Sequence, residues 1–359
     1  MKLSIGIVGL PNVGKSTLFN ALLKKQVADA ANYPFCTIEP NIGIVEVPDE
    51  RLPVLAKIVN TTKIVPAAVE FYDIAGIVKG ASVGEGLGNK FLSHIREVAA
   101  IVHVVRLFED PNVIHVTNKV DPKNDIETID SELILADLDT LGKQKEPRGK
   151  AEKEDLEKWD LVNRLKIELN KGIPARNVSL TPEEKHLIRE LNLLTMKPVI
   201  YAFNVSEEQL ADKAATAEKI KSLGVGANWL FFNAKLENDV LALSPDEQKE
   251  YLNQYGLEDT GLNRLIQKSY EILGLISFLT AGEIEARAWT IQKGTLAPQA
   301  AGTIHTDFEK KFIKADIIPY RDFVESNGWV AAREKGKVVS AGREYVMKDG
   351  DVVEFKIGA

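Results

Sequence analysis

A phosphate-binding pattern lies near the start of the chain. Residues 9–16 read GLPNVGKS and match GxxxxGK[ST], after an apolar run and before a segment with apolar residues at helical spacing. Glycines let backbone N–H groups turn toward phosphate oxygens, and the N-terminus of the following helix adds partial positive charge. We expect Lys15 to reach the outer phosphates and the Ser16 hydroxyl to bind Mg²⁺. The full set of expected nucleotide contacts in this loop is Asn12, Val13, Gly14, Lys15, Ser16 and Thr17.

A second pattern, DIAG at residues 73–76, follows an apolar run at 69–72 and matches the DxxG element of switch GTPases. Asp73, at the end of a strand, is expected to hold Mg²⁺ through water, and the Gly76 N–H to contact the terminal phosphate. Thr37 lies in the Pro-rich stretch NYPFCTIEPN, where such proteins carry a magnesium-binding switch threonine. The glycines that follow Gly76 indicate a loop that the terminal phosphate orders and hydrolysis releases.

The tetrapeptide NKxD, by which GTPases recognise guanine, occurs at residues 118–121. Consecutive parallel strands need a crossover of about a dozen residues or more. Only FEDPN separates the apolar run at 100–107 from the VIHV that precedes TNKVD. Ligands bind beyond the carboxyl ends of the strands in such sheets. We therefore do not expect this tetrapeptide to hold the base.

The next apolar run, PVIYAF, ends at Asn204, and the following residues Val205, Ser206 and Glu207 occupy the place of base recognition. Compared with NKxD, Val205 replaces the lysine and Glu207 replaces the aspartate with a side chain one methylene longer. A site that hydrogen-bonds the polar groups of one substrate can discriminate against an analogue by ~10⁴–10⁵. Loss of the lysine and aspartate contacts to guanine should therefore remove a strict preference for GTP. Adenine becomes admissible, with Val205 as an apolar edge and Asn204 or backbone groups reading the amino group. The alternative is that NVSE only caps a helix.

The remaining patterns indicate an α/β fold. Apolar runs at 3–8, 69–72, 100–107 and 198–203 alternate with helical segments, which predicts a mostly parallel sheet covered on both faces. Residues 125–197 are rich in Glu, Lys and Leu with apolar spacings of three and four, which favours an inserted helical hairpin, a coiled coil. Helices lying on the sheet are the alternative.

After Gly274 the chain becomes a mixture of strand-like and short helical segments, and REYVMKDGDVVEFKI predicts a β-hairpin turning at Asp349 and Gly350. The predicted domains are therefore a nucleotide domain (1–124 and 198–276), a helical insertion (125–197) and a C-terminal α+β domain (277–359).

Composition narrows the class of protein. The 359 residues carry a net charge of −7 and a single cysteine, Cys36, which excludes an intrachain disulfide and a Cys-based zinc site. The acidic balance argues against a globally basic nucleic-acid binder, so RNA contact would have to be local. No apolar run approaches the ~18–20 residues of a membrane span, and the N-terminus does not read as a signal peptide. We expect a cytoplasmic protein without a membrane partner.

Several motifs together resemble one family. GLPNVGKST, NYPFCTIEPN, DIAGIVKGAS, the NVSE variant and QAAGTIHTDFEKKFIKA look like the YchF/Obg-like ATPase family of translation-associated P-loop proteins, across essentially the whole chain. The resemblance implies a P-loop domain of the Obg type, an inserted coiled coil and a C-terminal TGS domain of ubiquitin-like fold. It also implies a preference for ATP, or acceptance of ATP and GTP, and the ribosome or a ribosomal subunit as partner.

The resemblance also assigns residues. It carries nucleotide contacts onto residues 12–17, magnesium onto Ser16 and Thr37, and adenine contact onto Val205. NAK at 233–235 occupies the place of the SAK-type loop behind the base, so Asn233 and Ala234 join the expected site, although Asn replaces Ser.

Hydrolysis is expected to be slow. Switch GTPases often orient the attacking water with a Gln directly after DxxG, and here that residue is Ile77. The resemblance suggests His115 as the group that positions the nucleophile, against the alternative of a packed or surface histidine. Lys15 and Gly76 complete the expected catalytic set. Asn12 additionally suggests K⁺ as a cofactor, because P-loop proteins with Asn there often recruit potassium.

Three functions remain open from the sequence. The first is a slow ATPase whose nucleotide state alters binding to the ribosome. The second is a strict GTPase that tolerates NVSE, and the third is a ribosome-binding module that seldom hydrolyses its nucleotide. Within the TGS domain, Lys310, Lys311 and Lys314 form a basic cluster that would suit RNA, with a solvated face as the alternative.

Overall fold

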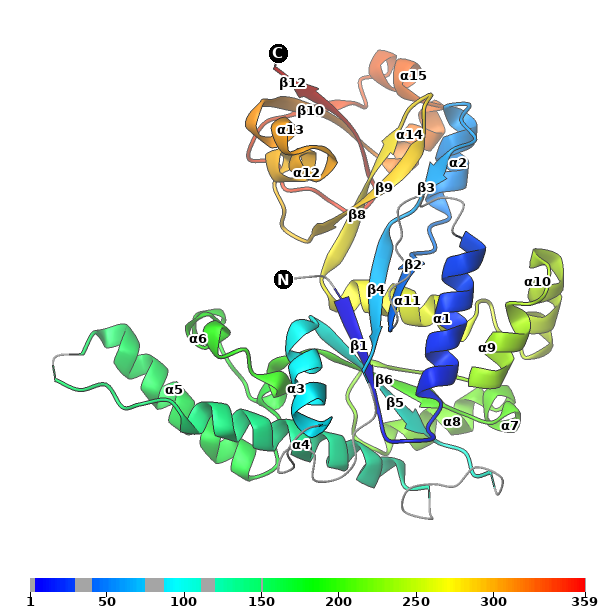
Figure 1. Ribbon diagram of the computed structural model, residues 1–359. Helices are drawn as coiled ribbons and strands as arrows, with labels where there is room; N and C mark the ends of the chain where they lie inside the picture. Colours follow the sequence, from blue (N-terminus) through cyan, green and yellow to red (C-terminus); the bar gives the residue numbers. More distant parts are fainter. Residues whose placement is uncertain (1–3, 30–40, 75–86, 111–119, 150, 359) are drawn as a thin grey trace. The chain divides into compact units, whose positions relative to one another are not determined.

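The computed structural model describes residues 4–29, 41–74, 87–110, 120–149 and 151–358, and Figure 1 shows their helices and strands. The chain divides into two compact units, which are described separately. The first comprises residues 1–22, 39–43 and 71–262, and the second comprises residues 23–38, 44–70 and 263–359. The division into three domains remains a prediction, and the packing groups residues 44–70 with the C-terminal segment.

A six-stranded sheet with the order β2-β4-β1-β5-β6-β7 carries the predicted phosphate loop. Its strands are β1 (Ser4–Val8), β2 (Ile42–Glu46), β4 (Ala68–Asp73), β5 (Ala100–Arg106), β6 (Val199–Asn204) and β7 (Trp229–Phe232). Every residue of β1, β5 and β6 is buried, as expected for strands covered on both faces. The parallel pairing of β1 with β5, β5 with β6 and β6 with β7 brings the carboxyl ends of these strands to one edge.

Helices lie between the strands of this sheet along the chain and follow its last strand. They are α1 (Lys15–Asp29), α3 (Leu87–Glu97), α4 (Pro122–Gly142), α5 (Lys153–Asn170), α6 (Pro182–Leu187), α7 (Glu207–Ala211), α8 (Lys213–Lys221), α9 (Ala234–Val240), α10 (Pro245–Gln254) and α11 (Gly261–Ile272). Short 3₁₀ turns η2 (Ala175–Asn177), η3 (Arg189–Leu191) and η4 (Leu194–Met196) follow α5 and α6.

The predicted helical hairpin is formed by α4 and α5, which run side by side in Figure 1. They share an apolar core that includes Leu141 and Leu165, and the returning chain adds Ala175 and Leu193 to it. The buried Asp137 of α4 fastens that return, because its carboxylate accepts hydrogen bonds from the backbone N–H groups of residues 194 and 195 at 2.7 and 2.8 Å. Burial raises the pKa of Asp137, and these hydrogen bonds oppose that rise.

The second unit contains a six-stranded sheet with the order β11-β10-β12-β8-β9-β3. Its strands are β3 (Ile64–Val65), β8 (Leu275–Ala281), β9 (Ala286–Gln292), β10 (Phe312–Pro319), β11 (Val339–Ala341) and β12 (Asp351–Ile357). Its helices are α2 (Arg51–Ile58), α12 (Ala297–Ile304), α13 (Thr306–Lys310), α14 (Tyr320–Ser326) and α15 (Trp329–Glu334). The apolar core lies between this sheet and α12.

The predicted hairpin around Asp349 is wrong. Gly350 does turn the chain, with φ +79°, but residues 343–348 form no strand of the sheet, and β12 pairs with β10 and β8. Asp349 has a different role, because its carboxylate accepts the backbone N–H of Ser277 at 2.9 Å and pairs with Arg51 at 2.8 Å. It therefore ties the turn to β8 and α2.

Candidate nucleotide site

The predicted phosphate loop lies between the buried end of β1 and the first turn of α1. Gly14 has φ +103°, and a Cβ there would lie 2.4 Å from Asn204 Nδ2, so no other residue type fits without displacing Asn204. Asn12 adopts the left-handed region with φ +62°, which Asn tolerates better than most residues. The loop thus turns as a phosphate-binding loop must, with the N-terminus of α1 beside it.

Lys15 is the first residue of α1 and is only 8% exposed. Its Nζ donates to the Leu10 carbonyl oxygen at 2.6 Å, which folds the side chain back over the loop. Burial lowers its pKa to about 8, and attraction to Asp73 opposes this only in part. Burial favours the neutral form of this ammonium, so a phosphate that binds beside it would strongly stabilise the charged form.

Asp73 ends β4 beside this lysine. Burial raises the pKa of its carboxyl, and the charge of Lys15 opposes the rise. A divalent cation would favour the ionised form. No cluster of three or more His, Cys, Asp or Glu side chains that could hold a metal occurs in the described ranges. A single carboxylate such as that of Asp73, together with the predicted Ser16 hydroxyl, still fits Mg²⁺. This ion is commonly bound by one or two carboxylates together with substrate phosphates and water.

Binding of ATP should depend on the protonation of Lys15. Because burial lowers its pKa to about 8, the side chain is charged below that pH and neutral above it. We expect the Kd for ATP to be flat below about pH 8 and to rise about tenfold per pH unit above it, as one proton must be taken up on binding. Calorimetric titration from pH 6.5 to about 9.5 measures this. In a Lys15→Arg variant that binds ATP, the rise in Kd should vanish. An identical rise in that variant would show that another group causes it.

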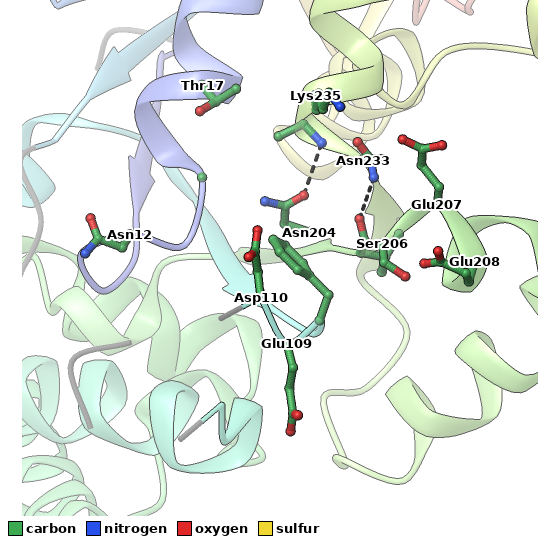
Figure 2. A pocket seen from close by; sticks show the side chains of 14 residues that line it. Asn12, Thr17, Glu109, Asp110, Asn204, Ser206, Glu207, Glu208, Asn233 and Lys235 are labelled. Atoms are coloured by element: carbon green, nitrogen blue, oxygen red, sulfur yellow. Dashed lines mark hydrogen bonds between the residues drawn. The ribbon is translucent and has the colours of Figure 1, made fainter. Parts of the chain in front are cut away.

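A cavity of about 570 Å³ opens next to the loop (Figure 2). Its described lining comes from four segments at the carboxyl edge of the sheet. These are the phosphate loop and α1 (Asn12, Gly14, Thr17), the chain after β5 (Phe108, Glu109, Asp110), the chain after β6 (Asn204, Val205, Ser206, Glu207, Glu208) and the chain after β7 (Asn233, Ala234, Lys235). The expected base site and the expected phosphate site therefore face one space.

Asn204 joins three of these segments. Its Nδ2 donates to the Val13 carbonyl at 3.1 Å, and its Oδ1 accepts the backbone N–H of Ala234 at 3.1 Å (Figure 2). Asn233 makes a similar link, since its Nδ2 donates to the Val205 carbonyl at 2.8 Å while its Oδ1 caps α9 at Leu236 N. Both asparagines thus brace the pocket, a role that the sequence-based prediction of base reading by Asn204 did not include.

Val205 and Glu207 differ in exposure. Val205 is apolar and 1% exposed, and it belongs to the lining of the cavity. Glu207 is exposed at the first turn of α7 and accepts a hydrogen bond from Tyr255 Oη at 3.2 Å. Ser206 caps α7, with its hydroxyl accepting the Gln209 N–H at 3.2 Å. The segment NVSE is therefore a helix cap as well as a cavity wall, and the two readings are compatible.

Some predicted residues cannot be placed. Thr37, Gly76 and His115 lie outside the described residues, as do Asn118 and Lys119 of the NKxD tetrapeptide. Asp121, the last residue of that tetrapeptide, caps α4 by accepting the Asn124 N–H at 3.2 Å. It does not line the described cavity.

The sequence-based prediction missed the wall formed by residues 108–110. FEDPN was read only as a short spacer, although its position directly after a buried parallel strand was a usable signal.

The predicted lysine cluster lies in the second unit, and Lys310, Lys311 and Lys314 are all exposed. Lys314 contacts its neighbours in the sheet, because its Nζ lies 3.2 Å from Asp316 Oδ1 and 3.0 Å from Ser340 Oγ.

Comparison with known proteins identifies the family. A family model described as a 50S ribosome-binding GTPase matches residues 4–138, and a YchF GTPase C-terminal model, described as a protein of unknown function, matches residues 275–358. The Ribosome-binding ATPase YchF of Bacillus subtilis is 50% identical over 364 residues, covering 99% of both chains. The chain belongs to the YchF family. The Ribosome-binding ATPase YchF of Escherichia coli O157:H7 is 47% identical over 362 residues, again covering 99% of both chains.

A solved structure shares the fold of this YchF family member. The Schizosaccharomyces pombe YchF GTPase superimposes with a TM-score of 0.89 at 39% identity, covering 99% of this chain and 98% of that one. The P-loop fold with its C-terminal α+β region, expected from the sequence, is thereby confirmed. Among the helices that the structure describes, none is long and apolar enough to span a bilayer.

Proposed function

We propose that this protein is a cytoplasmic, ribosome-associated nucleotidase that binds and slowly hydrolyses ATP, and that the change of nucleotide state alters its binding to the ribosome. The observation that carries the ATP assignment is the cavity shared by the phosphate loop and the NVSE segment, in which the apolar Val205 and the longer acid Glu207 stand where guanine would need Lys and Asp. The ribosome as partner is supported by the names of the relatives from B. subtilis and E. coli.

The proposed preference for ATP depends on the residues after β6. The Ala234 N–H is used by Asn204, and the described lining includes the carboxylates of Glu109, Asp110, Glu207 and Glu208. A carboxylate accepts hydrogen bonds from the amino group of adenine and from the N–H groups of guanine alike, so the charge of the lining does not separate the two bases. The separation is therefore assigned to Val205 and to the longer side chain of Glu207, which replace the Lys and Asp of NKxD.

The phosphates would bind along the loop between Asn12 and Thr17. Lys15 would neutralise the outer phosphates and hold them in line for attack by water, because its ammonium is buried and oriented before binding. The hydroxyl of Ser16, the carboxylate of Asp73 and, as proposed from the sequence, the hydroxyl of Thr37 would hold Mg²⁺. That ion would supply charge neutralisation at the phosphates. Gly76 and His115 stay proposed contacts of the terminal phosphate and the attacking water.

The slow step is expected to be chemical, since Ile77 cannot hydrogen-bond a water molecule. K⁺ bound near Asn12 would compensate part of this deficit by supplying positive charge at the phosphates. Equal turnover rates in sodium and potassium buffers would show that potassium is not a cofactor of the reaction.

Turnover measurements test the proposed function. Phosphate release is followed with saturating ATP or GTP, each with and without ribosomes. We expect slow release from ATP, with GTP used no better, and a change in the ATP rate when ribosomes are present. Rapid use of GTP alone would favour a strict GTPase. No release above blank in any condition would favour a ribosome-binding module that keeps its nucleotide intact.

A further inference from the structure

Arg106 is a buried cation at the end of β5. It is 1% exposed and pairs in register with Asn204 across the parallel β5–β6 ladder. Burying a charge is costly unless it is hydrogen-bonded. Its Nε donates to the Phe108 carbonyl at 3.0 Å and its Nη2 donates to the Asp110 carbonyl at 3.3 Å, while its guanidinium carbon lies 4.6 Å from the centre of the Phe108 ring. The charge thus engages the chain that directly follows the strand.

That chain, residues 108–110, is one wall of the cavity, and it belongs to no helix or strand. We call it the 108–110 wall. In Figure 2, Asp110 points toward Asn204, whereas Glu109 points away from it. These residues lie in no helix or strand, so hydrogen bonds from side chains contribute directly to their position. The two donations from Arg106 are therefore structural supports of the pocket surface.

Gln209 supports the residue before the wall. Its Nε2 donates to the Leu107 carbonyl at 3.1 Å, and its Oε1 accepts the Ser206 N–H at 3.0 Å. The Leu107 N–H in turn donates to the Asn204 carbonyl at 2.9 Å. The chain after β5 is thus joined to the chain after β6, and the two sides of the expected base site are linked through Gln209.

We propose that Arg106 and Gln209 are positioning residues for the nucleotide base: they hold the 108–110 wall beside Asn204 and Val205, and so determine affinity for the base while leaving the phosphate contacts unchanged. This proposal rests on the proposed function, because it takes the cavity to be the base site. Preorganisation of a pocket wall improves affinity by removing the cost of ordering it on binding.

The first test is Arg106→Lys, which keeps the positive charge but loses the planar fork that reaches two carbonyls. Binding of ATP and of inorganic tripolyphosphate, which has no base, is measured by calorimetry. We expect the affinity for ATP to fall about tenfold, as hydrogen bonds from a charged donor are lost, and the affinity for tripolyphosphate to stay within about twofold of the unmodified chain. Thermal unfolding of the same variant shows whether the fold is retained.

The second test is Gln209→Glu, which remains informative if the arginine variant does not fold. A glutamate can still accept the Ser206 N–H, as in an ordinary capping box, but it cannot donate to Leu107. Gln248→Glu is the matched control, because Gln248 Nε2 also donates to a backbone carbonyl, that of Leu243 at 3.0 Å, and Gln248 does not line the described cavity. We expect a selective loss of ATP affinity for the first variant and no change for the control.

Equal losses for ATP and tripolyphosphate would overturn the proposal, since the two residues would then act on the phosphate site or on the fold as a whole. Unchanged ATP affinity in both variants would overturn it as well. If the unmodified chain binds GTP far better than ATP, the ATP assignment fails. The losses of GTP affinity and of tripolyphosphate affinity in the two variants are then compared, and they decide the role of Arg106 and Gln209.

Discussion

Lys15→Met will reduce ATP hydrolysis by about a thousandfold while leaving the protein folded. Removal of one preorganised charge from a transition state typically costs about 10²–10³ in rate, and Lys15 is both buried and close enough to Asp73 for the two charges to interact. Methionine has a similar length and no charge, so the loss reports on electrostatics more than on packing. The measurement is single-turnover phosphate release at saturating ATP.

The unfolding behaviour of the same variant provides an independent check. Burial lowers the pKa of Lys15 to about 8, which means that its charged form destabilises the folded state at pH 7. Removal of the charge should therefore not lower the stability of the protein. We expect a Tm equal to or above that of the unmodified chain at pH 7. Lys219→Met, on the exposed face of α8, is the control and should hydrolyse ATP normally. Retained turnover in the Lys15 variant would remove this residue from the chemistry.

The double substitution Val205→Lys and Glu207→Asp will raise the affinity for GTP relative to that for ATP by about a hundredfold. An aspartate at this position can accept both donors on the guanine edge, and the lysine stem can lie along the ring while its ammonium reaches solvent. Discrimination of ~10⁴–10⁵ is within the range of such polar recognition, and the smaller expected value allows for Asn204 and Asn233, which stay as they are. The measurement is the ratio of the two Kd values.

Glu208→Asp is the matched control for the double variant, because it shortens an acid of the same helix turn that also lines the cavity. We expect its ratio of ATP to GTP affinity to match that of the unmodified chain. If the double variant keeps the original ratio, Val205 and Glu207 do not govern base choice. A shift of equal size in the control would show that shortening any acid of this helix turn changes base preference, whatever its position.

The parts of the fold that the sequence predicted best are those in which one physical signal dominates. The strands β1, β5 and β6 are near-continuous apolar runs because both of their faces are covered. The phosphate loop was readable because its glycine and lysine positions are fixed by backbone geometry. The assignment of the base site to the chain after β6, although NKxD occurs earlier in the chain, rests on the length that a crossover between parallel strands needs, and it stays a prediction.

Other features depend on contacts distant in the sequence, which a local pattern does not carry. The pair Asp349–Gly350 has the composition of a hairpin turn, yet the Asp349 carboxylate accepts the Ser277 N–H and pairs with Arg51 instead. The role of Asn204 as a brace emerges only when Val13 and Ala234 meet it in space. Arg106 likewise reads as part of a buried strand until its carbonyl partners are known.

A crystal structure of the unmodified chain with Mg²⁺ and a non-hydrolysable ATP analogue would show most directly where the base binds. We predict that the adenine ring lies in the cavity against Val205, between the 108–110 wall and residues 233–235, with the phosphates on Lys15. A complex in which the ring rests instead beside Asp121, with the cavity after β6 left to solvent, would contradict it.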